Sequence, residues 1–144
     1  LYECADEQVL VSKEIKFIKN YIDLERIRLN DKVIINVDIR GQYTDVRIAP
    51  LLFIPFIENA FKHGVNQRPL NPYISILFDF SHANQIHFTI ENNKPKIIET
   101  IEKTGGIGIT NVTKRLDLLY PNRYSLDIVN LIDIYKVNLN IQVR

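Results

Sequence analysis

Three polar side chains in the segment 55–64 have the types and the spacing to bind a charged ligand. Residues three and four positions apart share one face of an α-helix, so a helix here places Asn59, Lys62 and His63 together. The opposite face carries apolar residues, namely Phe53, Ile54, Ile57, Ala60 and Phe61. An amide, a cation and an imidazole can together bind an anion or a metal–phosphate group, and such a site needs no acidic residue beside them. The segment therefore predicts an amphipathic helix, ended by a left-handed cap at Gly64, whose polar face binds a nucleotide.

A glycine-rich turn at 105–108 is a second candidate for phosphate binding. It opens a segment in which apolar residues recur at helical spacing, at Ile109, Val112, Leu116 and Leu119. Glycines allow backbone amides to approach phosphate oxygens closely, and the start of a helix adds a partial positive charge. Such a turn alone is more often a flexible connection. Its position after the helix that carries Asn59 favours phosphate binding.

The composition indicates one globular domain. The chain has 144 residues, of which 46% are hydrophobic, and its formal net charge is +1, so no broad basic field favours nucleic acid or an anionic membrane. No apolar run approaches the roughly 18 residues of a membrane span. Cys4 has no second cysteine to pair with and fits a reducing compartment. Because the chain begins at Leu1 and contains no methionine, we expect it to be part of a longer protein.

Hydrophobic periodicity predicts an α+β fold. The expected order is helix, strand, helix, two strands, helix and two strands, with Ser12 as the N-cap of the first helix. The helices are expected at 12–29, 55–64 and 109–119, and the strands at 33–39, 74–80, 86–90, 124–129 and 135–143. Because every helix has an apolar stripe to bury, the helices are expected on one face of a mixed, mostly antiparallel sheet. The predicted fold class is therefore a two-layer α/β sandwich.

Three stretches of the chain follow one another in a distinctive order: Pro50–Gly64, then Ile90–Pro95, then Gly106–Leu116. In this order they resemble the ATP-binding domain of LytS-type sensor histidine kinases, within the superfamily of gyrase, heat-shock chaperones, histidine kinases and MutL. The resemblance covers almost the whole chain. It implies a Bergerat-type ATP-binding fold over residues 12–144, with residues 1–11 as the end of an upstream dimerisation and phosphoacceptor region.

The resemblance also implies roles for individual residues. Asn59 matches the asparagine whose side-chain oxygen binds the Mg²⁺ that bridges the ATP phosphates. Glu58 matches the acidic residue that precedes it, and is expected to orient Asn59 or to help activate the phosphate acceptor. Lys62 and His63 match positions that face the phosphates or the ribose. Further nucleotide contacts are expected from Asn92, Lys94, Gly106, Ile107, Gly108 and Asn111.

Two departures from the family pattern bear on activity. Asn92 stands where the superfamily has an aspartate that accepts a hydrogen bond from the adenine amine. An amide oxygen can accept the same bond, but without a charge, so weaker ATP binding is expected. Pro55 stands where the superfamily's ATPases have a glutamate that activates water. The proline therefore favours phosphoryl transfer over ATP hydrolysis.

The function implied by the resemblance is that of a two-component sensor histidine kinase. The ATP γ-phosphoryl group would pass to a histidine upstream of Leu1, in a homodimer of the full-length protein, and then to an aspartate of a response regulator. None of the three histidines in the chain resembles that phosphoacceptor. The alternatives are a nucleotide-sensing or dimer-forming pseudokinase, because of Asn92, and a superfamily ATPase. The implied location is a cytoplasmic domain of a protein held in the bacterial inner (plasma) membrane by segments outside this chain.

Overall fold

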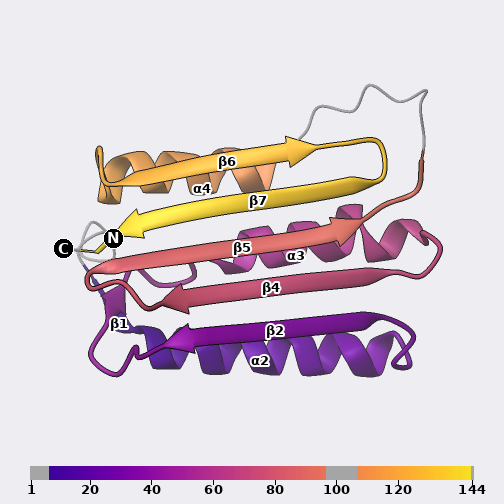
Figure 1. Cartoon of the computed structure of the whole chain (residues 1–144), viewed down its shortest axis with the longest axis horizontal. Helices are drawn as coiled ribbons and strands as arrows, with labels where there is room; N and C mark the ends of the chain where they lie inside the picture. Colours follow the sequence, from indigo (N-terminus) through magenta and orange to yellow (C-terminus); the bar gives the residue numbers. More distant parts are fainter. Residues whose placement is uncertain (1–6, 97–106, 144) are drawn as a thin grey trace.

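The computed structural model describes residues 7–96 and 107–143, and in this part of the chain three helices lie on one face of a five-stranded sheet (Figure 1). None of the described helices is long and apolar enough to cross a membrane. The helices are α2 (Val11–Arg28), α3 (Ile54–His63) and α4 (Ile107–Leu119), and a 3₁₀ turn, η1 (Val65–Gln67), follows α3. The strands of the sheet are β2 (Ile34–Gly41), β4 (Tyr73–Phe80), β5 (Gln85–Asn93), β6 (Tyr124–Asn130) and β7 (Ile134–Gln142). This arrangement confirms the predicted α+β fold.

The strand order explains how α3 comes to lie on the centre of the sheet. The order is β2-β4-β5-β7-β6, in which β2 and β4 are parallel and every other neighbouring pair is antiparallel. Two parallel strands need a crossover connection, and the crossover between β2 and β4 contains α3. The helix with the predicted polar face is therefore held against the sheet at both of its ends.

A short antiparallel ribbon, β1 (Val9–Leu10) with β3 (Arg47–Ile48), adds to the predicted elements and determines where α2 begins. The backbone N–H of Val11, the first helical residue, donates to the carbonyl of Val46 at 2.9 Å. The N-cap position is Leu10, which makes no side-chain capping bond. The prediction that Ser12 caps this helix is wrong, because a backbone carbonyl from the neighbouring segment already accepts from the first turn.

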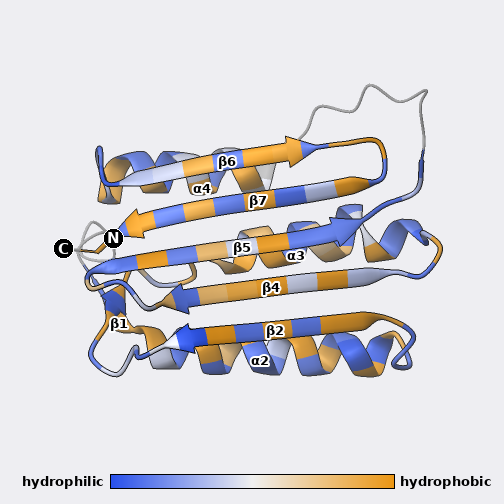
Figure 2. Ribbon diagram, viewed as in Figure 1, coloured by the Kyte–Doolittle hydropathy of each residue, from blue (hydrophilic) through white to orange (hydrophobic). Residues whose placement is uncertain are grey.

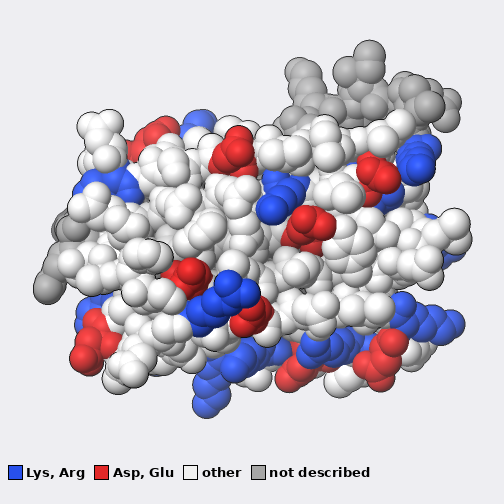
Figure 3. Space-filling view, viewed as in Figure 1, with Lys and Arg blue, Asp and Glu red and all other residues white. Residues whose placement is uncertain are grey.

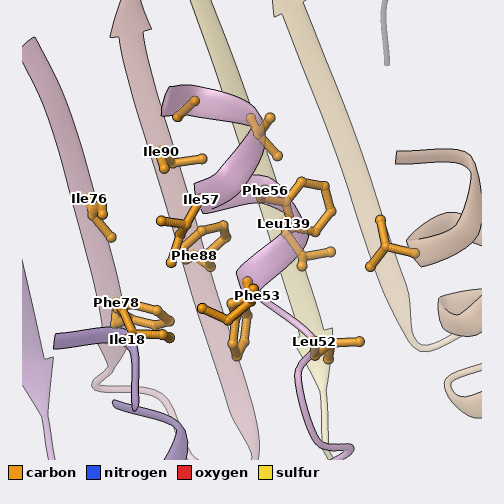
Figure 4. Packing of buried hydrophobic residues seen from close by; sticks show 14 of the residues in the cluster. Ile18, Leu52, Phe53, Phe56, Ile57, Ile76, Phe78, Phe88, Ile90 and Leu139 are labelled. Carbon is orange, nitrogen blue, oxygen red and sulfur yellow. The ribbon is translucent and has the colours of Figure 1, made fainter. Parts of the chain in front are cut away.

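The core lies between the helices and the sheet, where apolar residues alternate along each strand (Figure 2). Phe88 of β5 is central to it, since its ring centroid is 4.9 Å from that of Phe53 and 4.9 Å from that of Phe78. Phe56 of α3 lies 6.0 Å from the same ring, and Figure 4 shows these side chains together with Ile57. Each of the four phenylalanines is at most 1% exposed. Burial contributes about 25 cal/mol per Å² of apolar surface, so this cluster fixes α3 on β4 and β5.

Side chains from α2, from α4 and from Tyr120, the residue after α4, hold the loop that leads into α3. The backbone N–H of Ala49 donates to the Tyr120 hydroxyl at 2.9 Å, and that of Leu51 donates to the Glu14 carboxylate at 2.7 Å. Arg115 of α4 donates to the carbonyl of Pro50 at 2.9 Å. Leu51 has a positive φ of 56°, which is unfavourable for a residue with a branched side chain. The surrounding hydrogen bonds therefore impose the path of this loop and the direction in which α3 starts.

Candidate functional site

The predicted polar face of α3 is present, and its residues differ in exposure. Asn59 and His63 are half-buried, whereas Lys62 is exposed. Pro55 lies in the first turn, where its missing N–H is not needed by the helix. The helix therefore presents the amide and the imidazole at its edge and the ammonium group to solvent.

Gly64, the residue after α3, brings this helix into contact with β5. Its φ of −107° and ψ of −89° are not left-handed, so the predicted left-handed cap is wrong. A Cβ at this position would lie 2.3 Å from the Asn92 side-chain nitrogen and 2.5 Å from the Ala60 carbonyl oxygen. The glycine is thus required by close packing, and this packing places the end of α3 against Asn92.

Asn92, near the end of β5, faces the helices and is 1% exposed. Its side-chain NH₂ donates to the carbonyl of Asn93 at 2.9 Å. That bond orients the amide, so the oxygen is the atom with which Asn92 can accept a hydrogen bond from a ligand. Asn92 therefore lies at the junction of α3 and β5, against the end of the helix that carries Asn59.

Tyr135 of β7 completes this junction and is absent from the residues predicted from the sequence. It pairs directly with Asn92 in the register of β5 and β7, faces the helices and is 6% exposed. Burial raises the pKa of the Tyr135 phenol, and the adjacent Asn59 side chain lowers that pKa to a smaller extent. The contact with Asn59 falls short of hydrogen-bond geometry, so the hydroxyl has no partner among the described residues. The sequence did carry one signal for a buried hydroxyl, because the alternation of residues along the last strand places Tyr135 on its inward side.

The start of α4 is open at Gly108. Gly108 is exposed in the first turn, and a Cβ added there would meet no described atom within 4 Å. No described neighbour therefore requires a glycine at this position. Asn111, one turn further, is exposed. The predicted contact Gly106 and the side chain of Ile107 lie outside the described residues.

Two other predicted residues are directed towards different neighbours. The Lys94 ammonium group donates to the Asn130 side chain, and its backbone N–H donates to the Asp133 carbonyl at 3.0 Å. Glu58 is exposed on the side of α3 that faces α2. On that side the pKa of the Tyr21 phenol is raised to about 12 by burial and by the negative charges of Glu25 and Glu58. Lys94 is therefore held at the turn between β6 and β7, and Glu58 lies beside α2.

Among the described residues, the face of the sheet that the helices do not cover has no charged patch that would indicate a second binding site. Figure 3 shows acidic and basic side chains interspersed over the visible face, without a large area of one sign. Neutral polar residues, including Asn36, Ser75, Thr89 and Asn138, alternate on this side of the strands. The cluster of Asn59, Asn92 and the buried phenol is therefore the polar arrangement that most needs a functional explanation.

Comparison with known proteins gives that cluster a context. No family model matches the chain. The sensor histidine kinase YpdA of Escherichia coli K12 is 32% identical over 123 residues, and the sensor histidine kinase/phosphatase LytS of Staphylococcus aureus is 24% identical over 129 residues. The matches cover 80% and 82% of the chain but only 21% and 22% of the relatives. The chain thus spans about one fifth of the length of these proteins.

Solved structures share the fold over nearly all of the chain. The catalytic domain of histidine kinase ThkA matches with a TM-score of 0.60 and 13% identity, covering 95% of both chains. ThkA in complex with the response regulator protein TrrA matches with a TM-score of 0.63 and 13% identity, covering 96% of this chain and 42% of that one. The chain is therefore homologous to LytS-type sensor histidine kinases and has the fold of a histidine kinase catalytic domain.

Proposed function

We propose that this chain is the ATP-binding, catalytic domain of a two-component sensor histidine kinase. ATP with Mg²⁺ would bind between the end of α3, the end of β5 and the start of α4. The observation that carries the proposal is the close approach of Gly64, the residue after α3, to Asn92 of β5, because it would bring the helix that carries Asn59 and the predicted adenine acceptor to one site. The relationship to sensor histidine kinases supports the same conclusion.

The residues at this junction fit magnesium and a triphosphate. Asn59 offers a neutral oxygen ligand, which can help to complete an octahedral magnesium shell without repelling phosphate oxygens. Lys62 and His63 offer a positive charge and an imidazole on α3, and the open first turn of α4 at Gly108 would give room for phosphate groups. Asn92 would accept a hydrogen bond from the adenine amine. Bound ATP would provide the phosphoryl group, and the chain's own residues would hold and orient it.

Several parts of the proposal concern the longer protein. The phosphate acceptor would be a histidine upstream of this chain, in a homodimer of the full-length protein, and the next acceptor an aspartate of a response regulator. The complex of ThkA with TrrA supports a response regulator as partner. Attachment to the bacterial inner membrane would come from segments outside the chain. Pro55, in place of a water-activating glutamate, supports transfer over hydrolysis.

A nucleotide-sensing or dimer-forming pseudokinase is the second candidate. The observation that favours it is Asn92, an uncharged acceptor whose own NH₂ is already bonded to the carbonyl of Asn93. Hydrogen bonds to charged acceptors are worth about 1 to 2 kcal/mol more than neutral ones, so ATP binding that is weaker by roughly tenfold is expected. This candidate shares the binding site with the first and differs in the absence of phosphoryl transfer.

Replacement of Asn59 tests the binding site. We expect the wild-type chain to bind ATP saturably in isothermal titration with Mg²⁺, and Asn59→Ala to weaken this binding at least tenfold because a magnesium ligand is lost. Asn36→Ala is the matched control, since Asn36 is an exposed asparagine on the open side of β2, and its affinity should equal that of the wild type. Absence of ATP binding by the wild-type chain at millimolar nucleotide would refute the proposal.

A further inference from the structure

The Tyr135 hydroxyl is a buried polar group that the fold leaves without a partner. The residue is 6% exposed, and among residues 7–96 and 107–143 its hydroxyl is the one buried side-chain oxygen or nitrogen that makes no hydrogen bond. Buried tyrosine hydroxyls usually find a partner, because an unpaired polar group loses its bonds to water without compensation. An explanation for this hydroxyl must therefore come from its surroundings.

Those surroundings are the two asparagines of the candidate site. Tyr135 lies directly opposite Asn92 in the antiparallel pairing of β5 with β7, so their side chains emerge next to each other on the same face of the sheet. The other end of the ring reaches the Asn59 side chain. The phenol thus lies between the proposed adenine acceptor and the proposed magnesium ligand.

We propose that Tyr135 is a nucleotide-contacting residue whose hydroxyl forms a hydrogen bond with the bound nucleotide. The inference rests on the proposed function, and it assigns to the same site a residue that the family resemblance did not indicate. Another buried tyrosine shows the contrast: the Tyr120 hydroxyl accepts from the backbone N–H of Ala49 at 2.9 Å. The Tyr120 hydroxyl is used by the fold, whereas that of Tyr135 lies beside the Asn59 side chain and makes no hydrogen bond with the described residues.

The variants Tyr135→Phe and Tyr120→Phe test this assignment, because each removes one buried hydroxyl and keeps the ring. In Tyr135→Phe we expect the melting temperature of the nucleotide-free domain to stay the same or rise, since an unpaired polar atom is removed. The dissociation constant for ATP with Mg²⁺ should increase about 2- to 10-fold, the effect of one lost neutral hydrogen bond. In Tyr120→Phe the melting temperature should fall, because the Ala49 N–H loses its acceptor, and the ATP affinity should change little.

Two results would overturn the assignment. One is an unchanged ATP dissociation constant in Tyr135→Phe, measured by titration on a wild-type background that binds ATP. The other is a fall in melting temperature of Tyr135→Phe equal to that of Tyr120→Phe, because it would mean that the hydroxyl bonds to the protein. A wild-type chain that binds no ATP would refute the proposed function instead, and the melting temperatures would still show whether the hydroxyl is unpaired.

Discussion

Gly64 shows at the scale of one residue how packing and site are linked. Its φ of −107° is open to any amino acid, so the requirement for glycine comes from its neighbours. The nearest atoms to an added Cβ are the side-chain nitrogen of Asn92 at 2.3 Å and the carbonyl oxygen of Ala60 at 2.5 Å. A larger residue would push Asn92 away from α3 or separate the helix from the strand. Either movement would disturb the place where Asn59 and Asn92 meet.

We therefore expect Gly64→Ala to lower the free energy of unfolding by about 1–3 kcal/mol, the usual cost of overpacking. Urea denaturation followed by circular dichroism measures it. Gly108→Ala is the matched control, because a Cβ there meets no described atom within 4 Å, and alanine favours a helix over glycine by about 0.5–1 kcal/mol. Equal stability of the two variants would show that the contact between Gly64 and Asn92 is not tight.

The sequence indicated two residues that the fold brings close to Tyr135, but for a physical reason it did not indicate Tyr135 itself. The resemblance indicated Asn59 and Asn92, and the fold does bring these two together at the junction of α3 and β5. Tyr135 was not among the predicted residues, because strand alternation shows which side a residue faces but not which distant side chain it reaches. The cap at Gly64 was wrong for the same reason, since helix-end statistics cannot show that a strand side chain lies against the glycine.

At the scale of elements, the loop before α3 depends on α2 and α4 as much as on its own sequence. Glu14 of α2 accepts the N–H of Leu51, and Arg115 of α4 donates to the carbonyl of Pro50 and, at 3.4 Å, to that of Leu51. The loop is thus held from both sides. Such a contact can pass a shift of either helix to the start of α3, the helix that carries Asn59.

Glu14 should make the stability of this loop depend on pH. Burial raises the pKa of the Glu14 carboxyl, against smaller opposing effects of the Leu51 N–H and the Arg115 charge. Its pKa in the folded state thus exceeds the ordinary value of 4.5, and the folded chain binds this proton more tightly than the unfolded chain. The contribution of Glu14 to stability is therefore complete below pH 4.5 and is lost as the pH rises through the folded-state pKa.

We expect Glu14→Gln, which keeps a side-chain oxygen for Leu51, to lose less stability than the wild type between pH 4.5 and about pH 7. Urea denaturation at several pH values measures this difference. Glu7→Gln, a change at an exposed position, serves as the control and should keep the wild-type dependence. A Glu14→Gln variant with the same pH dependence as the wild type would show that burial of this carboxyl has no energetic effect.

The order and type of the main elements were predictable because their apolar periodicity is strong. The long helix was expected at 12–29 and lies at Val11–Arg28, and the last two strands were expected within a residue or two of β6 and β7. The ribbon of β1 and β3 was not predictable, because two-residue strands have no periodicity and exist only through pairing. Nor could the sequence show the hydrogen bond between Tyr120 and Ala49, which joins residues 71 positions apart.

At the scale of the whole molecule, the first described residues and the candidate site lie at opposite ends of the sheet. β1 and the end of β7 lie at one end, whereas β5 ends at the other, near the end of α3 (Figure 1). The nine residues of β5 span about 30 Å at roughly 3.3 Å per residue. In the proposed kinase, the phosphate acceptor would have to reach the end of the sheet at which β5 ends.

This geometry leads to a prediction for the full-length protein, of which the chain would be the ATP-binding part. Incubated with radiolabelled ATP and Mg²⁺, the full-length protein should acquire a phosphate that is labile in acid and stable in base, as a phosphohistidine is. The isolated chain should acquire none, because none of its three histidines resembles the phosphoacceptor. In the full-length protein Asn59→Ala should abolish labelling, and the exposed control Asn36→Ala should preserve it. ATP binding without any labelling of the full-length protein would instead identify a pseudokinase, since the site would then bind nucleotide without transferring its phosphoryl group.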